Sequence, residues 1–159
     1  MPGRGHPALQ DAEVALCSAC LLGLACRWDA AQKRAPKVEF ALAGLPVVPV
    51  CPEVAGGLLV PRAKVELKGG DGLAVLDGRA RAENEEGRDV SAEFTLGARL
   101  ALEAARRYGA TVAVLKEGSP SCGVHRTCVD GAWVKGQGIA AAALSRAGLI
   151  LLSDEDLPD

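Results

Sequence analysis

Aromatic residues and long apolar runs are both scarce in this chain. Phe, Trp and Tyr make up 3% of the 159 residues, although 49% of the residues are hydrophobic, so the core must be built mainly from Leu, Val and Ala. No apolar run approaches the length that spans a bilayer, and the N-terminal stretch MPGRGHPALQDAEV lacks the apolar region of a secretory signal. We therefore expect a cytoplasmic protein with no membrane partner.

A strong charge of either sign is also missing. The chain has 18 Lys and Arg residues and 20 Asp and Glu residues, which gives a formal net charge of −2. A nucleic-acid-binding domain usually carries a strongly basic surface, so a small-molecule substrate is favoured over nucleic acid. The length suits one domain with its own core, and no repeat or linker divides the chain. We expect a flexible leader over residues 1–13 and a single α/β domain over residues 14–159.

Short apolar runs alternate with helical patterns along this domain. Buried strands are predicted at residues 15–20, 46–50, 111–115 and 149–152. Helices are predicted at residues 38–42, 91–108 and 139–146. Right-handed β-α-β crossovers then build a three-layer, Rossmann-like fold, in which helices cover both faces of a small, mainly parallel sheet.

Two segments carry more specific structural signals. In the longest predicted helix, Ser91 is a candidate N-cap and Gly109 a candidate C′ residue. One face of this helix shares helical spacing and is formed by Phe94, Ala98, Ala101, Ala105 and Tyr108. Residues 54–90 are rich in glycine and charge, which predicts an excursion with a β-hairpin around residues 69–72.

Six cysteines in a chain without a secretory signal point to metal binding or redox chemistry rather than to disulfides. Three of them, Cys20, Cys51 and Cys122, each lie just past the end of a predicted strand. The carboxyl ends of parallel strands share one edge of the sheet, where ligand sites form. The three thiolates are best explained as one metal site that leaves a position free for chemistry.

The spacing of the cysteines also bears on the metal. A structural zinc site usually shows tight C-x₂₋₄-C pairs, and only Cys17 and Cys20 form one. The two histidines, His6 and His125, are better interpreted as solvent-facing residues than as ligands. Three isolated cysteines suit a [4Fe–4S] cluster with one iron not bound by cysteine. Such a cluster is sensitive to oxygen and can be lost in an aerobic preparation.

The other cysteines have simpler explanations. Cys17 lies inside the first predicted strand and is interpreted as a small core residue. Alternation would direct it away from Cys20 unless the chain bends. Cys26 is either a surface thiol or an alternative ligand, and Cys128 is expected to be dispensable.

Polar residues accompany two of the candidate ligands. Glu53 follows Cys51 by two residues, which suits a general acid–base next to a cluster but is equally compatible with an exposed loop carboxylate. Ser119 and Ser121 lie in the loop SPSCG that carries Cys122. Their hydroxyl groups could bind sulfur or substrate, or could belong to an ordinary Ser-Pro turn.

The chain resembles the bacterial 2-thiouracil desulfidase (desulfurase) family. The resemblance covers residues 14–155 and rests on the motifs SACLLG, CRWD, CPEVAGGLLVPR, LDGRAR, SAEF and LKEGSPSCG, in family order. It implies an α/β fold, a [4Fe–4S] cluster held by Cys20, Cys51 and Cys122, a catalytic carboxylate at Glu53, and a catalytic serine at Ser119 or Ser121. The implied reaction converts 2-thiouracil to uracil and sulfide. The family often reads RYDG where this chain has Arg27-Trp28-Asp29-Ala30.

These observations lead to one main hypothesis and one rival. The main hypothesis is non-redox desulfuration of a thiolated nucleobase or a similar small thiocarbonyl compound. The rival is a structural or sensor module that binds a metal or an Fe–S cluster without turnover. The rival explains the cysteines equally well but assigns no role to Glu53 or to the SPSC loop.

Overall fold

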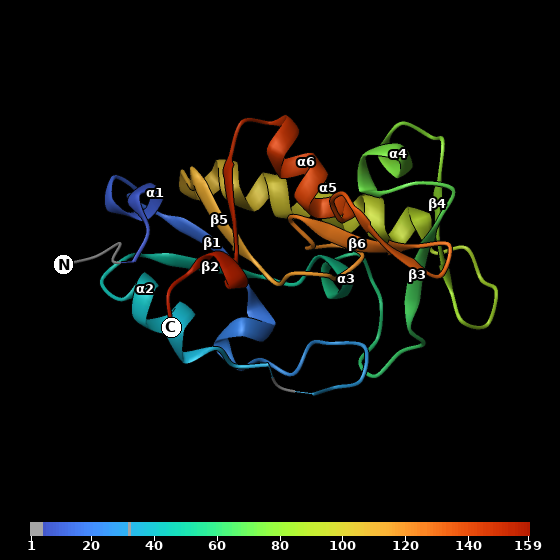
Figure 1. Cartoon of the computed structure of the whole chain (residues 1–159), viewed down its shortest axis with the longest axis horizontal. Helices are drawn as coiled ribbons and strands as arrows, with labels where there is room; N and C mark the ends of the chain where they lie inside the picture. The colour runs from blue at the N-terminus through green and yellow to red at the C-terminus, as the bar shows by residue number, and fades with distance from the viewer. Residues whose placement is uncertain (1–4, 32) are drawn as a thin grey trace.

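The computed structural model describes residues 5–31 and 33–159, which form two sheets joined by a long helix (Figure 1). The strands are β1 (Ala15–Ser18), β2 (Val47–Val50), β3 (Val65–Lys68), β4 (Arg81–Asn84), β5 (Val112–Leu115), β6 (Arg126–Val129), β7 (Ala132–Lys135) and β8 (Ile150–Ser153). The helices are α1 (Pro7–Gln10), α2 (Pro36–Leu42), α3 (Pro52–Ala55), α4 (Gly72–Leu76), α5 (Ser91–Tyr108) and α6 (Ile139–Arg146), with 3₁₀ turns η1 (Ala19–Leu22) and η2 (Asp154–Asp156).

The first sheet contains the four predicted strands. Its order is β2-β1-β5-β8, and every neighbouring pair is parallel. Side chains alternate across it: Leu16, Ala113 and Leu115 pack with residues of α5 and α6, whereas Ala15 and Val114 pack with residues of α1, α2 and η1. Helices therefore cover both faces, and the predicted three-layer α/β fold is confirmed.

The second sheet is mixed and has the order β4-β3-β6-β7. β3 and β4 are antiparallel, as expected for the excursion, but residues 69–72 do not form the tight hairpin turn that was predicted there. Instead the connection contains α4, because the Asp71 side chain accepts a hydrogen bond from the backbone N–H of Ala74 and caps the helix. The antiparallel pair of β6 and β7 was not predicted.

Helix α5 runs behind both sheets (Figure 1). Phe94 and Ala98 pack with Val65 and Leu67 of β3, whereas Ala105 packs with strands of the first sheet. The predicted apolar face is correct except at its end, since Tyr108 is 55% exposed. Gly109 ends the helix with a φ of 74°, as predicted.

The start of α5 differs from the prediction. Val90 is the N-cap residue and Ser91 is the first helical residue. The Ser91 hydroxyl does not cap the helix but accepts a hydrogen bond from the N–H of Ala82, in β4. The Ser91 hydroxyl thus bonds to a backbone group that is distant in sequence, rather than to the first turn of its own helix.

The N-terminal segment predicted as a leader is only partly described. Residues 1–4 lie outside the described residues, and Pro7–Gln10 form α1. Leu9 is fully buried with core residues of the first sheet. Within the described part of the chain, no helix combines the length and the apolar character needed to cross a membrane.

Two glycines allow α3 to lie directly against α5. A Cβ atom on Gly97 would overlap the carbonyl oxygen of Pro52, and one on Gly56 would overlap the carbonyl oxygen of Glu93. Only glycine permits such a close approach of two backbones. This contact holds the N-terminus of α3, and with it Cys51 and Glu53, at a set position beside the first sheet.

Candidate active site

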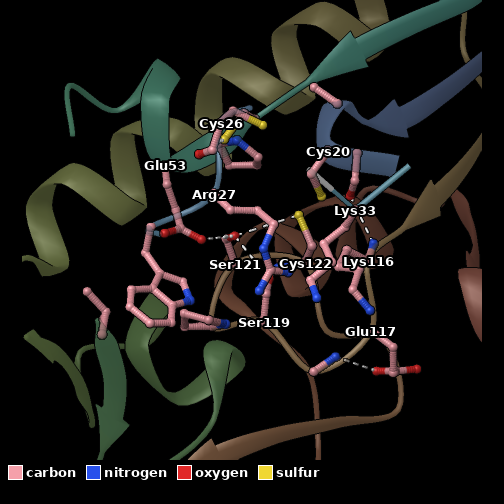
Figure 2. A pocket seen from close by; sticks show the side chains of 18 of the residues that line it. Cys20, Cys26, Arg27, Lys33, Glu53, Lys116, Glu117, Ser119, Ser121 and Cys122 are labelled. Atoms are coloured by element: carbon pink, nitrogen blue, oxygen red, sulfur yellow. Dashed lines mark hydrogen bonds between the residues drawn. The ribbon is translucent and has the colours of Figure 1, made fainter. Parts of the chain in front are cut away.

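A cavity of about 380 Å³ lies at the carboxyl ends of the strands of the first sheet. Residues of both sheets and of the loop after η1 line it (Figure 2). A ligand site was predicted at this edge, because ligands bind at the carboxyl ends of parallel strands.

The three cysteines of the sequence prediction all line this cavity. Cys20 is in η1, directly after β1, Cys51 is the N-cap residue of α3, directly after β2, and Cys122 is in the loop after β5. Cys20 is 7% exposed and Cys122 5% exposed, and Cys51 is half-buried. The bend from β1 into η1 explains why Cys17 and Cys20 pack in the same cluster rather than on opposite faces of the sheet.

A fourth thiol lies beside them. Cys26 also lines the cavity, and its thiol interacts with the neighbouring thiols of Cys20 and Cys51, with a net rise in its pKa. The Cys51 thiol in turn donates to the carbonyl oxygen of Cys26 at 3.6 Å. Cys26 therefore belongs to the edge of the site.

Crowding and burial raise the pKa values of Cys51 and Cys122, which keeps these two thiols protonated when no metal is bound. Burial raises the pKa of Cys122 to about 12. The hydrogen bond with Cys26, together with burial, raises the pKa of Cys51. A bound metal reverses this balance, because its positive charge deprotonates a coordinating thiol.

The chemistry of these side chains fits an Fe–S cluster, which is held by cysteine thiolates. Among the residues that the structure describes, no group of three or more His, Cys, Asp or Glu side chains is arranged to hold one metal ion. An Fe–S cluster binds each cysteine through a different iron, so its ligands are spread around a larger object. Cys20, Cys51 and Cys122 supply three thiol donors around one cavity, the set expected for a cluster with one iron not bound by cysteine.

Glu53 lies in the first turn of α3 and faces the cavity. Its Oε1 atom accepts hydrogen bonds from Nε and Nη2 of Arg62, at 3.1 and 3.0 Å. Its Oε2 atom accepts a hydrogen bond of 2.8 Å from the hydroxyl of Ser121. The carboxylate is thus not an exposed loop residue but has a defined partner on each oxygen.

The two candidate serines occupy different positions. The Ser119 hydroxyl accepts a hydrogen bond of 2.7 Å from the backbone N–H of Cys122 and lies 3.3 Å from the Ser121 hydroxyl. The Ser121 hydroxyl contacts Glu53 and lies 3.6 Å from the Cys122 sulfur. Ser119 therefore stabilises the loop, whereas Ser121 connects the carboxylate to a candidate ligand. The start of α6 supports this loop from behind, since a Cβ on Gly138 would overlap the Ser121 backbone.

Glu117 anchors the other end of the same loop. Its buried Oε1 atom accepts hydrogen bonds from four backbone N–H groups, those of Gly118, Val124, His125 and Arg126, at 2.8 to 3.3 Å. Burial by itself would raise the pKa of Glu117, but these donors outweigh it and lower the pKa below its ordinary value of 4.5.

We expect Glu117→Gln to lower the free energy of unfolding by about 2 kcal/mol at neutral pH, because the amide replaces a charged acceptor. The ionised Glu117 carboxylate stabilises the fold at pH values above its unfolded-state pKa, near 4.5. As the pH falls through the lower folded-state pKa, the carboxylate is protonated and this stabilisation is lost. Denaturant titrations at several pH values should therefore show the difference from wild type shrinking in acid. A difference that is independent of pH would contradict this role, and the exposed Glu103→Gln change serves as the control.

Comparison with known proteins identifies the family of the chain that contains this site. Residues 15–156 match the 2-thiouracil desulfurase family. The chain belongs to this family. It is 35% identical over 147 residues to the protein YbbK of Bacillus subtilis (strain 168), covering 91% of this chain and 97% of that protein. It also resembles a solved structure described as the [4Fe-4S]-dependent thiouracil desulfidase TudS, with a TM-score of 0.76, 37% identity, and coverage of 92% of this chain and 93% of the other.

This member of the desulfurase family departs from the expected loop motif at Ala30. The family motif often has glycine there, and Ala30 has a φ of 60°, in the left-handed region that favours glycine. The loop nevertheless keeps its turn, with Asp29 accepting a hydrogen bond from the N–H of Ala31 at 2.9 Å. Trp28 of the same loop lines the cavity, so the turn carries an aromatic ring to the site.

Two of the six cysteines lie elsewhere. Cys17 is fully buried in β1, and burial raises its pKa to about 12, as suits a core residue. Cys128 lies in β6 and lines a neighbouring cavity rather than this one.

Sequence reasoning missed three residues of the site. Arg62 ends the motif CPEVAGGLLVPR but was assigned no role there, although it binds Glu53. Trp133 lies in the unpredicted strand β7 and lines the cavity beside Gly118. Glu117 belongs to the motif LKEGSPSCG but was assigned no role there. The motif itself was the available signal for Arg62.

Proposed function

We propose that this protein is a [4Fe–4S]-dependent desulfidase that removes sulfur from a small thiolated substrate such as 2-thiouracil. Membership of the 2-thiouracil desulfurase family and the likeness to TudS support this activity. The observation that carries the proposal is the juxtaposition of Glu53, hydrogen-bonded to Ser121, with the three strand-end cysteines in one cavity.

Cys20, Cys51 and Cys122 would hold the cluster. Each comes from a different segment, and all of them are free thiols on one cavity wall. When bound, such a cluster supplies an iron without a cysteine ligand that acts as a Lewis acid and sulfur acceptor. The protein holds the thiolates in place and shields them, since Cys20 and Cys122 are almost fully buried.

The net reaction exchanges one sulfur atom for one oxygen atom. A thiocarbonyl compound and water give the corresponding carbonyl compound and hydrogen sulfide, without any change in oxidation state. A group that takes a proton from the attacking water and returns it to the departing sulfur or the ring is therefore useful. We assign this role to Glu53, and its hydrogen bond with Ser121 supports a path in which Oε2 exchanges the proton through the serine hydroxyl.

The serine variants should behave differently. Ser121→Ala removes the hydroxyl that binds Glu53 and should reduce sulfide release by roughly 10²-fold while the cluster is retained. Ser119→Ala leaves Glu53 its partner but removes the hydrogen bond to the N–H of Cys122, so it should mainly destabilise the loop. Sulfide release and cluster absorption, measured for both variants, separate the two roles. Equal losses of activity with intact clusters would contradict the assignment to Ser121.

The deciding experiment is anaerobic reconstitution of the protein with iron and sulfide, followed by an assay of sulfide release from 2-thiouracil. We expect turnover that depends on the cluster content. A fully loaded protein that releases no sulfide from any thiolated base would favour the non-catalytic module instead.

We also place the protein in the cytoplasm, because the cysteines lining the site are free thiols and a reducing compartment preserves them.

A further inference from the structure

The Arg62 side chain makes four hydrogen bonds at the site. Its guanidinium group donates to Glu53 through two nitrogens, to the carbonyl oxygen of Leu59 at 3.0 Å, and to the carbonyl oxygen of Cys26 at 3.0 Å. The side chains of Arg62 and Glu53 are only 7% and 12% exposed. Ion pairs on the surface contribute little, but this one is shielded from water and its donors are nearly all used.

The geometry divides the two oxygens of Glu53 between two tasks. Both nitrogens of the Arg62 fork bind Oε1, at 3.1 and 3.0 Å. Oε2 is left for Ser121, at 2.8 Å. A partial rotation of the carboxylate would break both bonds to arginine, so the pairing with Arg62 keeps one carboxylate oxygen directed at Ser121.

Arg62 also ties the carboxylate to the loop that covers the cavity. Its side chain binds the carbonyl oxygen of Cys26, and its backbone N–H donates to the carbonyl oxygen of Trp28 at 2.8 Å. That carbonyl of Cys26 is the group that accepts the hydrogen bond of the Cys51 thiol. One side chain therefore links the acid–base group with the segment beside a candidate cluster ligand.

We propose that Arg62 is a positioning residue for the desulfuration: it orients Glu53 so that Oε2 exchanges protons with Ser121. This inference rests on the proposed function. Lysine cannot replace arginine here, because the donors of an ammonium group all lie on one nitrogen and lack the planar fork that binds Oε1 through two nitrogens. A merely structural role in holding the loop would act independently of Glu53.

A double-mutant cycle distinguishes these roles. The proteins are wild type, R62K, E53Q and the R62K/E53Q double variant, each reconstituted anaerobically and checked for cluster absorption and thermal midpoint. Arg146→Lys is the matched control, since Arg146 pairs with Asp77 on the surface and lines neither this cavity nor the adjoining one.

We expect R62K to bind a full cluster and to lose about 10- to 100-fold in kcat for 2-thiouracil, with KM little changed. In the E53Q background the same change should cost less than about 3-fold, because the group that Arg62 orients is already inactive. Arg146→Lys should behave like wild type.

Two results would overturn the inference while leaving the function intact: equal losses from R62K in both backgrounds, or an R62K protein that fails to fold or to bind the cluster. Either one would make Arg62 a structural support of the loop. A fully loaded wild-type protein without activity would instead overturn the proposed function, and the inference with it.

Discussion

Glu53→Gln should retain the cluster and lose sulfide release by a factor on the order of 10² or more. Glutamine is nearly isosteric with glutamate, so it can keep contacts with Arg62 and Ser121. It cannot take up and return a proton between water and substrate at neutral pH. The measurement is sulfide released from 2-thiouracil under anaerobic conditions, normalised to the cluster content of each preparation.

Glu103→Gln is the matched control for this experiment. Glu103 lies on the exposed side of α5, where it pairs with Arg99 at 3.8 Å, and it does not line the cavity. This variant should release sulfide at the wild-type rate. If Glu53→Gln also turns over at that rate, the carboxylate is a bystander, and the acid–base role moves to solvent or to another residue.

Alanine at Cys20, Cys51 or Cys122 should abolish the broad visible absorption of the reconstituted protein, and with it all activity. Each cysteine comes from a separate segment, so no neighbour in sequence replaces a lost ligand in the same position. Iron and sulfide analysis of each variant provides a second, independent measurement. A single variant among these three that kept a complete, stable cluster would remove that cysteine from the ligand set.

The other cysteines provide the controls. Cys128→Ala should retain the cluster because Cys128 does not line the cavity, and Cys17→Ala should retain it because this thiol is buried in β1. Cys26→Ala is the sharper comparison, since its thiol contacts both Cys20 and Cys51. We expect the cluster to survive this change as well. Loss of the cluster in Cys26→Ala alone among these controls would make Cys26 a fourth ligand.

The strands and helices around the site were largely predictable from local patterns. The bounds of α6 and the C-terminal end of α5 agree with the prediction, because helical spacing and Gly109 define where α5 ends within the segment itself. The two central strands of the first sheet, β1 and β5, are buried on both faces, which leaves a strong signal in the sequence. Once these strands are parallel, the topology alone brings Cys20, Cys51 and Cys122 to one edge.

The second sheet was harder to predict, since its signals are weak or depend on distant partners. All four residues of β7 are exposed, so the strand shows no apolar alternation. Ser91 has the character of a helix cap, yet its hydroxyl is used by the N–H of Ala82 in another element. Local propensity cannot predict a hydrogen-bond donor from a distant segment, because that donor reaches the hydroxyl only in the folded chain.

What the sequence determined by itself is the inventory of the site and the edge where it assembles: three strand-end cysteines, a carboxylate two residues after one of them, and a serine pair before another. Only the tertiary structure decided how these groups are paired. It placed Ser121 rather than Ser119 on Glu53, and it brought Arg62 to the other oxygen of the same carboxylate. Hydrogen bonds between side chains depend on distances of a few tenths of an ångström, and these are set by the packing of α3 against α5 and of the Ser121 loop against α6.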